Sequence, residues 1–122
     1  TDWARLPALY TAVVDALNAV PGVVAASAHS SHAYRSGANL YFTLAASPSD
    51  PSEYTATYDA CWNAALQAAD DLGAGLAHHH GVGRVRRDWM KSEVGDGGVA
   101  MLRSIKSALD PDGLFNPGVL IP

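Results

Sequence analysis

The sequence predicts an α+β fold, in which helices pack on one face of a small, mainly antiparallel sheet. Two segments carry apolar residues at helical spacing, and a short run between them alternates apolar and polar residues as a half-buried strand does. The expected order is helix, two-stranded hairpin, long helix, short strand, one or two helices and a tail from about residue 110. The last of these helices covers residues 99–109, and a helical turn is expected before it at residues 88–91. Two helices on one face of the sheet is the economical way to bury these apolar stripes.

Helix boundaries are marked by proline and glycine. The first helix is expected after Pro7, whose fixed φ suits a first turn, and ends at Pro21-Gly22. The second begins at Asp50-Pro51, an acidic cap followed by proline, and continues to Gly73. Its apolar stripe is interpreted as core packing rather than chemistry. The stripe consists of Tyr54, Tyr58, Cys61, Trp62, Ala65, Ala69 and Leu72.

The clearest strand covers residues 39–45, where apolar side chains alternate toward the core and Tyr41 points to the opposite face. If the preceding turn centres on Ser36-Gly37, the antiparallel register places His32 opposite Tyr41. That arrangement would give the hairpin one polar face. A further short strand is expected at residues 74–80.

The chain is organised around three histidines, a Gly-x-Gly turn and an arginine: His78, His79, His80, Gly81, Gly83 and Arg84. Imidazole exchanges protons near neutral pH, so it suits general acid or base chemistry. Glycines without a Cβ let a ligand approach the backbone N–H groups. The combination predicts a site for an anionic or protonating substrate.

The histidine run has two alternative interpretations, a surface loop and a metal site. A short histidine run can be a solvated loop on the surface. If the segment is extended, His78 and His80 share one face and could form a pair of metal ligands, but a third ligand would be needed. Cys61 has no companion cysteine and is expected inside a helix, so the site is assigned no metal.

Composition restricts the broad class of the protein. The 122 residues allow one domain, and 48% hydrophobic with 16% charged residues excludes disorder. A net charge of −4 argues against nucleic acid as a partner. One cysteine and no long apolar run favour a soluble protein of a reducing compartment, expected to be the cytoplasm. The alanine-rich helices favour a bacterial source. The chain opens at Thr1 without a methionine, so we expect a piece of a longer protein.

Several motifs together resemble the C-terminal part of the cap domain of FAD-linked oxidases of the vanillyl-alcohol oxidase type. The likeness is greatest to the alkylglycerone phosphate synthase group, for which the triple histidine is the specific feature. The motifs are Ser31-His32-x-Tyr34, Gly37-x-x-Leu40-Tyr41-Phe42, His78-His79-His80-Gly81-Val82-Gly83, Trp89-Met90-Lys91, Asp110-Pro111 and Asn116-Pro117-Gly118.

The resemblance implies roles for particular residues. It implies that Tyr41, His78, His79 and His80 are catalytic. It implies further that His32 and Arg84 bind the substrate or its phosphate, and that Gly81, Gly83 and Asn116 lie near the cofactor. The reaction of that group exchanges the acyl group of an acylated dihydroxyacetone phosphate for a long-chain alcohol.

The cofactor implied by the resemblance is FAD, held mainly by a separate domain. The whole of residues 1–122 would then belong to the cap, and the FAD-binding domain of the same parent chain would be its partner. A small-molecule or lipid substrate is expected. The resemblance also allows a peripheral membrane contact and a homodimer of the parent. The isolated cap would be inactive.

Two alternative functions remain open from the sequence. The first is the cap of an FAD-dependent 2-hydroxyacid dehydrogenase or oxidase, acting on a substrate such as D-lactate or glycolate. There a histidine would abstract a proton while hydride passes to the flavin. The second is a stand-alone ligand-binding module without enzymatic activity.

Overall fold

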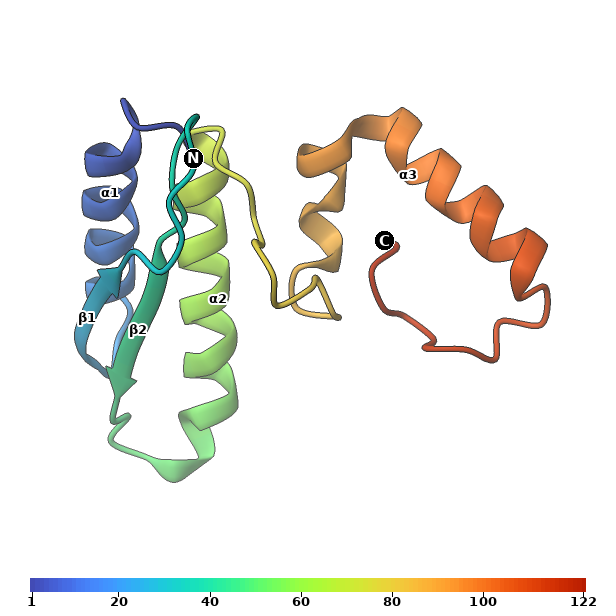
Figure 1. The fold of residues 1–122 in the computed structure, drawn as a ribbon. Coiled ribbons are helices and arrows are strands. Elements are labelled where there is room, and N and C mark those ends of the chain that lie inside the picture. The colour runs from blue at the N-terminus through green and yellow to red at the C-terminus, as the bar shows by residue number, and fades with distance from the viewer. The chain divides into compact units, whose positions relative to one another are not determined.

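The computed structural model describes all residues 1–122, which divide into two compact units, Thr1–Gly75 and Leu76–Pro122. The first unit contains α1 (Leu6–Asn18), β1 (Val23–His29), β2 (Tyr41–Ala46), the short 3-10 helix η1 (Pro51–Glu53) and α2 (Tyr54–Asp71), as Figure 1 shows. The second contains the 3-10 helix η2 (Arg87–Trp89) and α3 (Met90–Leu109). None of these helices combines the length and the apolarity needed to cross a bilayer.

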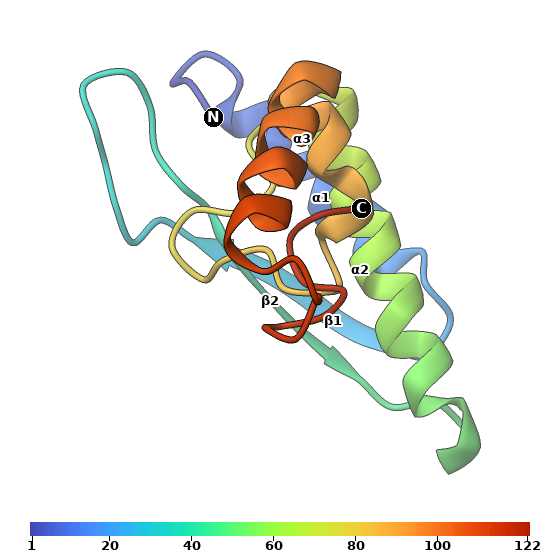
Figure 2. The same cartoon turned by 90° about the vertical axis from the view of Figure 1, so that its right-hand side faces the viewer.

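The first unit confirms the predicted α+β class. Strands β1 and β2 form an antiparallel sheet of two strands. Helix α1 packs on both β1 and α2, and the two helices run side by side along the sheet (Figures 1 and 2).

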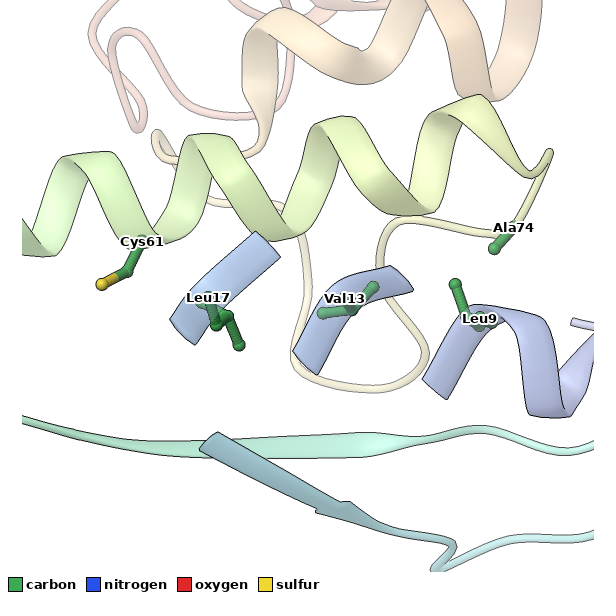
Figure 3. Close-up of a cluster of buried hydrophobic side chains, with 5 residues drawn as sticks. All are labelled: Leu9, Val13, Leu17, Cys61 and Ala74. Atoms are coloured by element: carbon green, nitrogen blue, oxygen red, sulfur yellow. The ribbon is translucent and has the colours of Figure 1, made fainter. Parts of the chain in front are cut away.

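The core of this unit lies between the helices and the sheet. Leu9, Val13 and Leu17 of α1 meet Cys61 of α2 and Ala74 (Figure 3). The three residues of α1 and Cys61 belong to the apolar stripes that the helical spacing predicted, and burial of such a stripe is what stabilises a helix of this length. Burial also raises the pKa of the Cys61 thiol, so the group is a neutral packing residue at physiological pH.

The start of the second helical segment follows the predicted capping pattern. The Asp50 carboxylate accepts a hydrogen bond of 2.8 Å from the Ser52 backbone N–H, and Pro51 opens η1. This hydrogen bond, which favours the charged form, lowers the pKa of Asp50. Tyr54 and Tyr58 differ from the prediction, because about half of each side chain is exposed (54% and 53%) instead of packed in the core.

The predicted register of the hairpin is wrong: His29, not His32, lies opposite Tyr41. The turn begins one residue earlier than expected, since the Tyr34 N–H donates to the Gly37 carbonyl at 2.7 Å. The Asn39 N–H donates to the His32 carbonyl at 3.1 Å, and the next pair along the hairpin is His29 with Tyr41. Between these two pairs, two residues that follow β1 (30 and 31) lie opposite one residue that precedes β2 (40). An extra residue of this kind shifts every pairing that follows it.

The N-terminus explains why the turn departs from the local signal. Gly37 forms an antiparallel bridge with Asp2, and the Ala38 N–H donates to the Thr1 carbonyl at 3.0 Å. A Cβ on Gly37 would lie 1.9 Å from the Thr1 oxygen. Glycine is therefore required here for close approach of two backbone segments rather than for a left-handed turn conformation.

The third predicted strand, residues 74–80, is also wrong. The segment is irregular, and the Leu76 N–H donates to the Glu93 carboxylate at 2.8 Å instead of to a strand partner. His78 and His80 therefore do not share the face of a strand, and the geometry on which a metal-ligand pair was considered is missing.

The second unit consists of a loop, helix α3 and the C-terminal tail. Helix α3 breaks at Gly95, whose φ of 70° and ψ of 172° are not helical. Only glycine adopts these angles readily, so the presence of glycine at position 95 allows the helix to break there. The helix ends at Leu109, in agreement with the predicted last helix.

Asp110 organises the turn that follows α3. Its side chain is 6% exposed and forms an ion pair with Lys106. It also accepts hydrogen bonds from the backbone N–H groups of Leu114 (2.9 Å) and Phe115 (3.0 Å). The hydrogen bond from Lys106, supported by these two N–H groups, holds the pKa of Asp110 below its usual value of 3.8. A single carboxylate thus fixes the path of the tail.

Acidification is expected to release this turn. Because the folded state lowers the pKa of Asp110, its contribution to stability is complete above pH 3.8 and is lost as the pH falls through the folded value. The protection factors of the Leu114 and Phe115 amides should therefore fall as the pH drops below 3.8 towards the folded-state pKa of Asp110. In Asp110→Ala, which removes both acceptor oxygens, the two amides should be weakly protected already at neutral pH, with no further acid step. Equal protection of both amides at pH 7 and pH 2 in the wild type would contradict this role.

Candidate functional site

Tyr41 lies on the face of the sheet that is turned away from the helices, named here the outer face. The outer face carries exposed side chains from both strands: Ala25, Ser27, His29, Tyr41, Thr43 and Ala45. Phe42 alternates with Tyr41 and packs against the core instead. This confirms the predicted orientation of Tyr41, which retains 40% exposure.

The nearest aromatic neighbour of Tyr41 across the sheet is His29. Their ring centroids are 5.2 Å apart and their planes differ by 24°, which is a stacked arrangement. The pairing follows directly from the register, in which the two residues are Cα partners. The sequence interpretation missed His29 because it derived the partner of Tyr41 from the wrong turn.

His32 occupies a different position from the one predicted. Its backbone N–H donates to the Asn39 side-chain oxygen at 2.8 Å, and its Nδ1 lies 3.0 Å from the Ser31 hydroxyl. The Asn39 amide in turn donates to Ser31 at 3.1 Å. These contacts place His32 in the polar network of the hairpin end, on the side of Asn39 rather than across from Tyr41.

An apolar cavity of about 650 Å³ opens on the other face of the sheet. Phe42 and Leu44 line it from β2, and Tyr58 and Trp62 line it from α2. Because successive residues of a strand point to opposite faces, Tyr41 does not reach this cavity. Its lining offers hydrophobic contact and no ionised side chain.

The three consecutive histidines of the second unit form a cluster of rings. Nδ1 of His78 lies 2.6 Å from Nδ1 of His79, and the centroids of His79 and His80 are 4.3 Å apart. Two ring nitrogens at hydrogen-bonding distance require one N–H donor and one acceptor. The two imidazoles can therefore pass a proton between them. A general acid or base needs such a transfer to return to its starting protonation state after each turnover.

The loop after the histidines is tied to the C-terminal tail. The Arg84 guanidinium donates to the Pro117 carbonyl (3.1 Å), and the Leu120 N–H donates to the Gly83 carbonyl (3.0 Å). Arg87 reaches the Gly118 carbonyl at 3.3 Å. Arg84 thus has a structural partner in the tail, a role that the sequence interpretation did not anticipate. Its side chain remains exposed.

Gly81 and Gly83 have left-handed φ angles of 74° and 61°. A Cβ at either position would meet no atom within 4 Å, so the backbone conformation and not crowding requires glycine. The loop backbone is consequently open on the side where a side chain would stand. Asn116 also has a positive φ (47°) and accepts the Val119 N–H at 3.2 Å in the turn of the tail.

Comparison with known protein families shows which family this chain belongs to. A family model described as FAD linked oxidases, C-terminal domain, matches residues 1–120. The chain belongs to this family. The predicted resemblance is thereby confirmed at the level of the FAD-linked oxidases.

Relatives of the FAD-linked oxidase family are similar over most of the chain. The uncharacterized FAD-linked oxidoreductase YgcU of Escherichia coli is 30% identical over 98% of this chain, which covers 26% of that protein. Alkyldihydroxyacetonephosphate synthase of Trypanosoma brucei brucei is 35% identical over 77% of the chain and 15% of its own length. The glycolate oxidase subunit GlcD of E. coli is 26% identical over 85% of the chain and 22% of its length. The chain thus spans about a quarter or less of these relatives.

The side chains of this FAD-linked oxidase domain suit one part of flavin chemistry. A phenol and neighbouring imidazoles are proton donors and acceptors, and they fit beside a substrate rather than around the phosphates of a dinucleotide. No Gly-rich turn leads into the start of a helix, since the Gly81-x-Gly83 loop continues into the irregular residues 84–86. The donor set therefore fits residues that would face a flavin and its substrate.

Proposed function

We propose that this chain is the substrate-cap portion of an FAD-dependent enzyme that resembles alkylglycerone phosphate synthase. In this proposal the parent enzyme exchanges the acyl group of acyl-dihydroxyacetone phosphate for a long-chain alcohol. Tyr41, His78, His79 and His80 carry the proton transfers. The FAD-binding domain of the same parent chain completes the site, and the cap is inactive without it.

Two observations support this proposal. Synthases from three organisms match at 35% identity, those of T. brucei brucei, Caenorhabditis elegans and Dictyostelium discoideum. Tyr41 stands on the open outer face of the sheet, where a substrate can reach it, and the adjacent rings of His78 and His79 share hydrogen-bonding geometry. Loss of a fatty acid and entry of an alcohol require a proton to be given and another to be taken, which matches these groups.

FAD supplies, when it is bound, an electron-accepting ring against which the substrate carbon reacts. This chain's own residues supply the rest of the site. Tyr41 or a protonated imidazole gives a proton to the departing carboxylate oxygen, and a neutral imidazole takes the proton of the incoming hydroxyl. Gly81, Gly83 and Asn116 are proposed to border the cofactor, because the open loop backbone allows close approach.

The substrate phosphate is proposed to bind near the basic loop. Arg84 already donates to the Pro117 carbonyl and can offer its remaining N–H groups to a phosphate, since guanidinium carries five donors. His32, in the hairpin network, is proposed as a second polar contact of the substrate. Both side chains are exposed, as contact with an incoming ligand demands.

A second candidate function is oxidation of a 2-hydroxy acid. It is favoured by the similarity to the glycolate oxidase subunit GlcD over 85% of the chain. In that reaction an imidazole takes the hydroxyl proton of the substrate while hydride leaves the adjacent carbon for the flavin. The same histidine cluster serves both reactions, so the site residues alone do not distinguish them.

One experiment separates the two functions. The purified flavoprotein that contains this chain is mixed without oxygen with glycolate or D-lactate, and its visible flavin absorbance is followed. In parallel it receives an acylated dihydroxyacetone phosphate and a labelled long-chain alcohol, and labelled ether product is measured. We expect ether product and an unbleached flavin. Bleaching by a hydroxy acid without ether product would establish the second function and refute the first.

A further inference from the structure

We propose that His29 is a positioning residue for Tyr41, holding the phenol ring in one orientation on the outer face of the sheet. The inference rests on the proposed function of Tyr41 and adds a residue that neither the motifs nor the comparisons single out. It arises from the observed register, which makes the two residues direct partners across the strands.

The rings of His29 and Tyr41 are close enough to restrict each other. The two rings are stacked, with a centroid separation of 5.2 Å and an interplanar angle of 24°. Aromatic pairs in this range attract each other beyond simple burial of their surface. A stacked partner also restricts χ1 and χ2 of tyrosine, because most other rotamers would separate the rings.

The pair lies at the end of the two-stranded sheet, where the backbone ladder no longer continues. Tyr41 is the first residue of β2 and His29 is the last of β1, so both stand where the regular ladder ends. Both side chains are exposed on the outer face, away from the core that fixes Phe42. A stack of this kind removes rotamer freedom from an exposed tyrosine at a strand end, and a catalytic group must be held in one geometry to be efficient.

Neighbouring pairs on the outer face differ in character. The next pairs along the strands are Ser27 with Thr43 and Ala25 with Ala45, all small side chains. These small side chains cannot stack on the phenol, whereas the ring of His29 does. They also provide a matched control, since Ser27→Ala changes the same face one pair away without touching the stack.

The test uses the flavoprotein that contains this chain, labelled with fluorotyrosine, with the Tyr41 signal assigned by its loss in Tyr41→Phe. Stacking shifts the resonance of a ring nucleus, so the ¹⁹F signal of Tyr41 should move in His29→Ala. It should remain near its wild-type position in His29→Phe, which keeps an aromatic ring, and in Ser27→Ala. This readout does not depend on any activity.

Turnover is measured on the same proteins. For His29→Ala we expect kcat to fall by roughly tenfold, the factor that corresponds to a stacking interaction of this kind, with KM little changed. His29→Phe should recover most of the loss, and Ser27→Ala should behave as wild type. A merely structural stack would lower the melting temperature and leave kcat unchanged.

Each outcome decides the matter. An unmoved ¹⁹F signal in His29→Ala overturns the stack, and a moved signal with unchanged kcat overturns its positioning role. If the wild type turns over neither substrate class, the proposed function fails, while the ¹⁹F result still shows whether His29 orients Tyr41. A shifted signal together with the loss and the phenylalanine rescue of kcat establishes the proposal.

Discussion

Replacing Tyr41 with phenylalanine is expected to lower the turnover of the flavoprotein by about 10²- to 10⁴-fold, the usual contribution of a general acid or base. The substitution removes only the hydroxyl oxygen. The ring that stacks on His29 remains, and the core residues lie on the other face of the sheet. The loss should therefore appear in kcat, with the melting temperature within about 2 °C of the wild type.

A matched control for this variant is Tyr10→Phe. Tyr10 lies on α1 and is 41% exposed, almost the same exposure as the 40% of Tyr41. It undergoes the same chemical change outside the outer face and should retain full turnover. If Tyr41→Phe kept more than half of the wild-type rate, the phenol would have no part in proton transfer, and the histidine cluster alone would have to supply it.

The largest effect on stability is expected from Leu17→Ala, which should reduce the free energy of unfolding of the first unit by about 2–5 kcal/mol. Leu17 is 1% exposed and sits in the cluster of Figure 3 beside Val13 and Cys61. It also lines the apolar cavity between β2 and α2. Truncation would enlarge a space that already exists, so the neighbours have little means to close around it.

Urea unfolding followed by circular dichroism measures this change. Leu109→Ala is the matched control, because the same atoms are removed from a side chain that is 78% exposed. Its free energy of unfolding should change by no more than about 0.5 kcal/mol. Equal midpoints for Leu17→Ala and the wild type would show that the α1 cluster is not the core that stabilises this unit.

Helix positions could be predicted from the sequence because the signals are local. The apolar spacing of α1 and the Asp50 cap before α2 are contained in a few adjacent residues, and both appear in the structure. The alternation of β2 likewise fixed which face Tyr41 occupies. The sequence left open whether one or two helices follow residue 88, and the break of α3 at Gly95 separates a first helical turn from the last helix. The glycine that marks this break was not identified from the sequence.

The site residues divide in the same way. Tyr41 and the three histidines are recognisable from their motifs, and the fold class and the FAD-linked oxidase family were both correctly predicted. The Tyr41–His29 pair and the bond from Arg84 to Pro117 were not, because each joins residues whose contact depends on a register or on a tail path. That Tyr41 and the three histidines act on one substrate is a proposal.

The sequence by itself determined the helices, the two hairpin strands and the chemical groups, because helical period, strand alternation and residue type are properties of short segments. Only the tertiary structure decided which groups meet. Backbone pairing of Thr1 and Asp2 with the hairpin end, together with one extra residue opposite Leu40, set the register that brings His29 to Tyr41. A contact between residues far apart in the chain leaves no periodic trace, and a single extra residue is enough to change the partner of every residue beyond it.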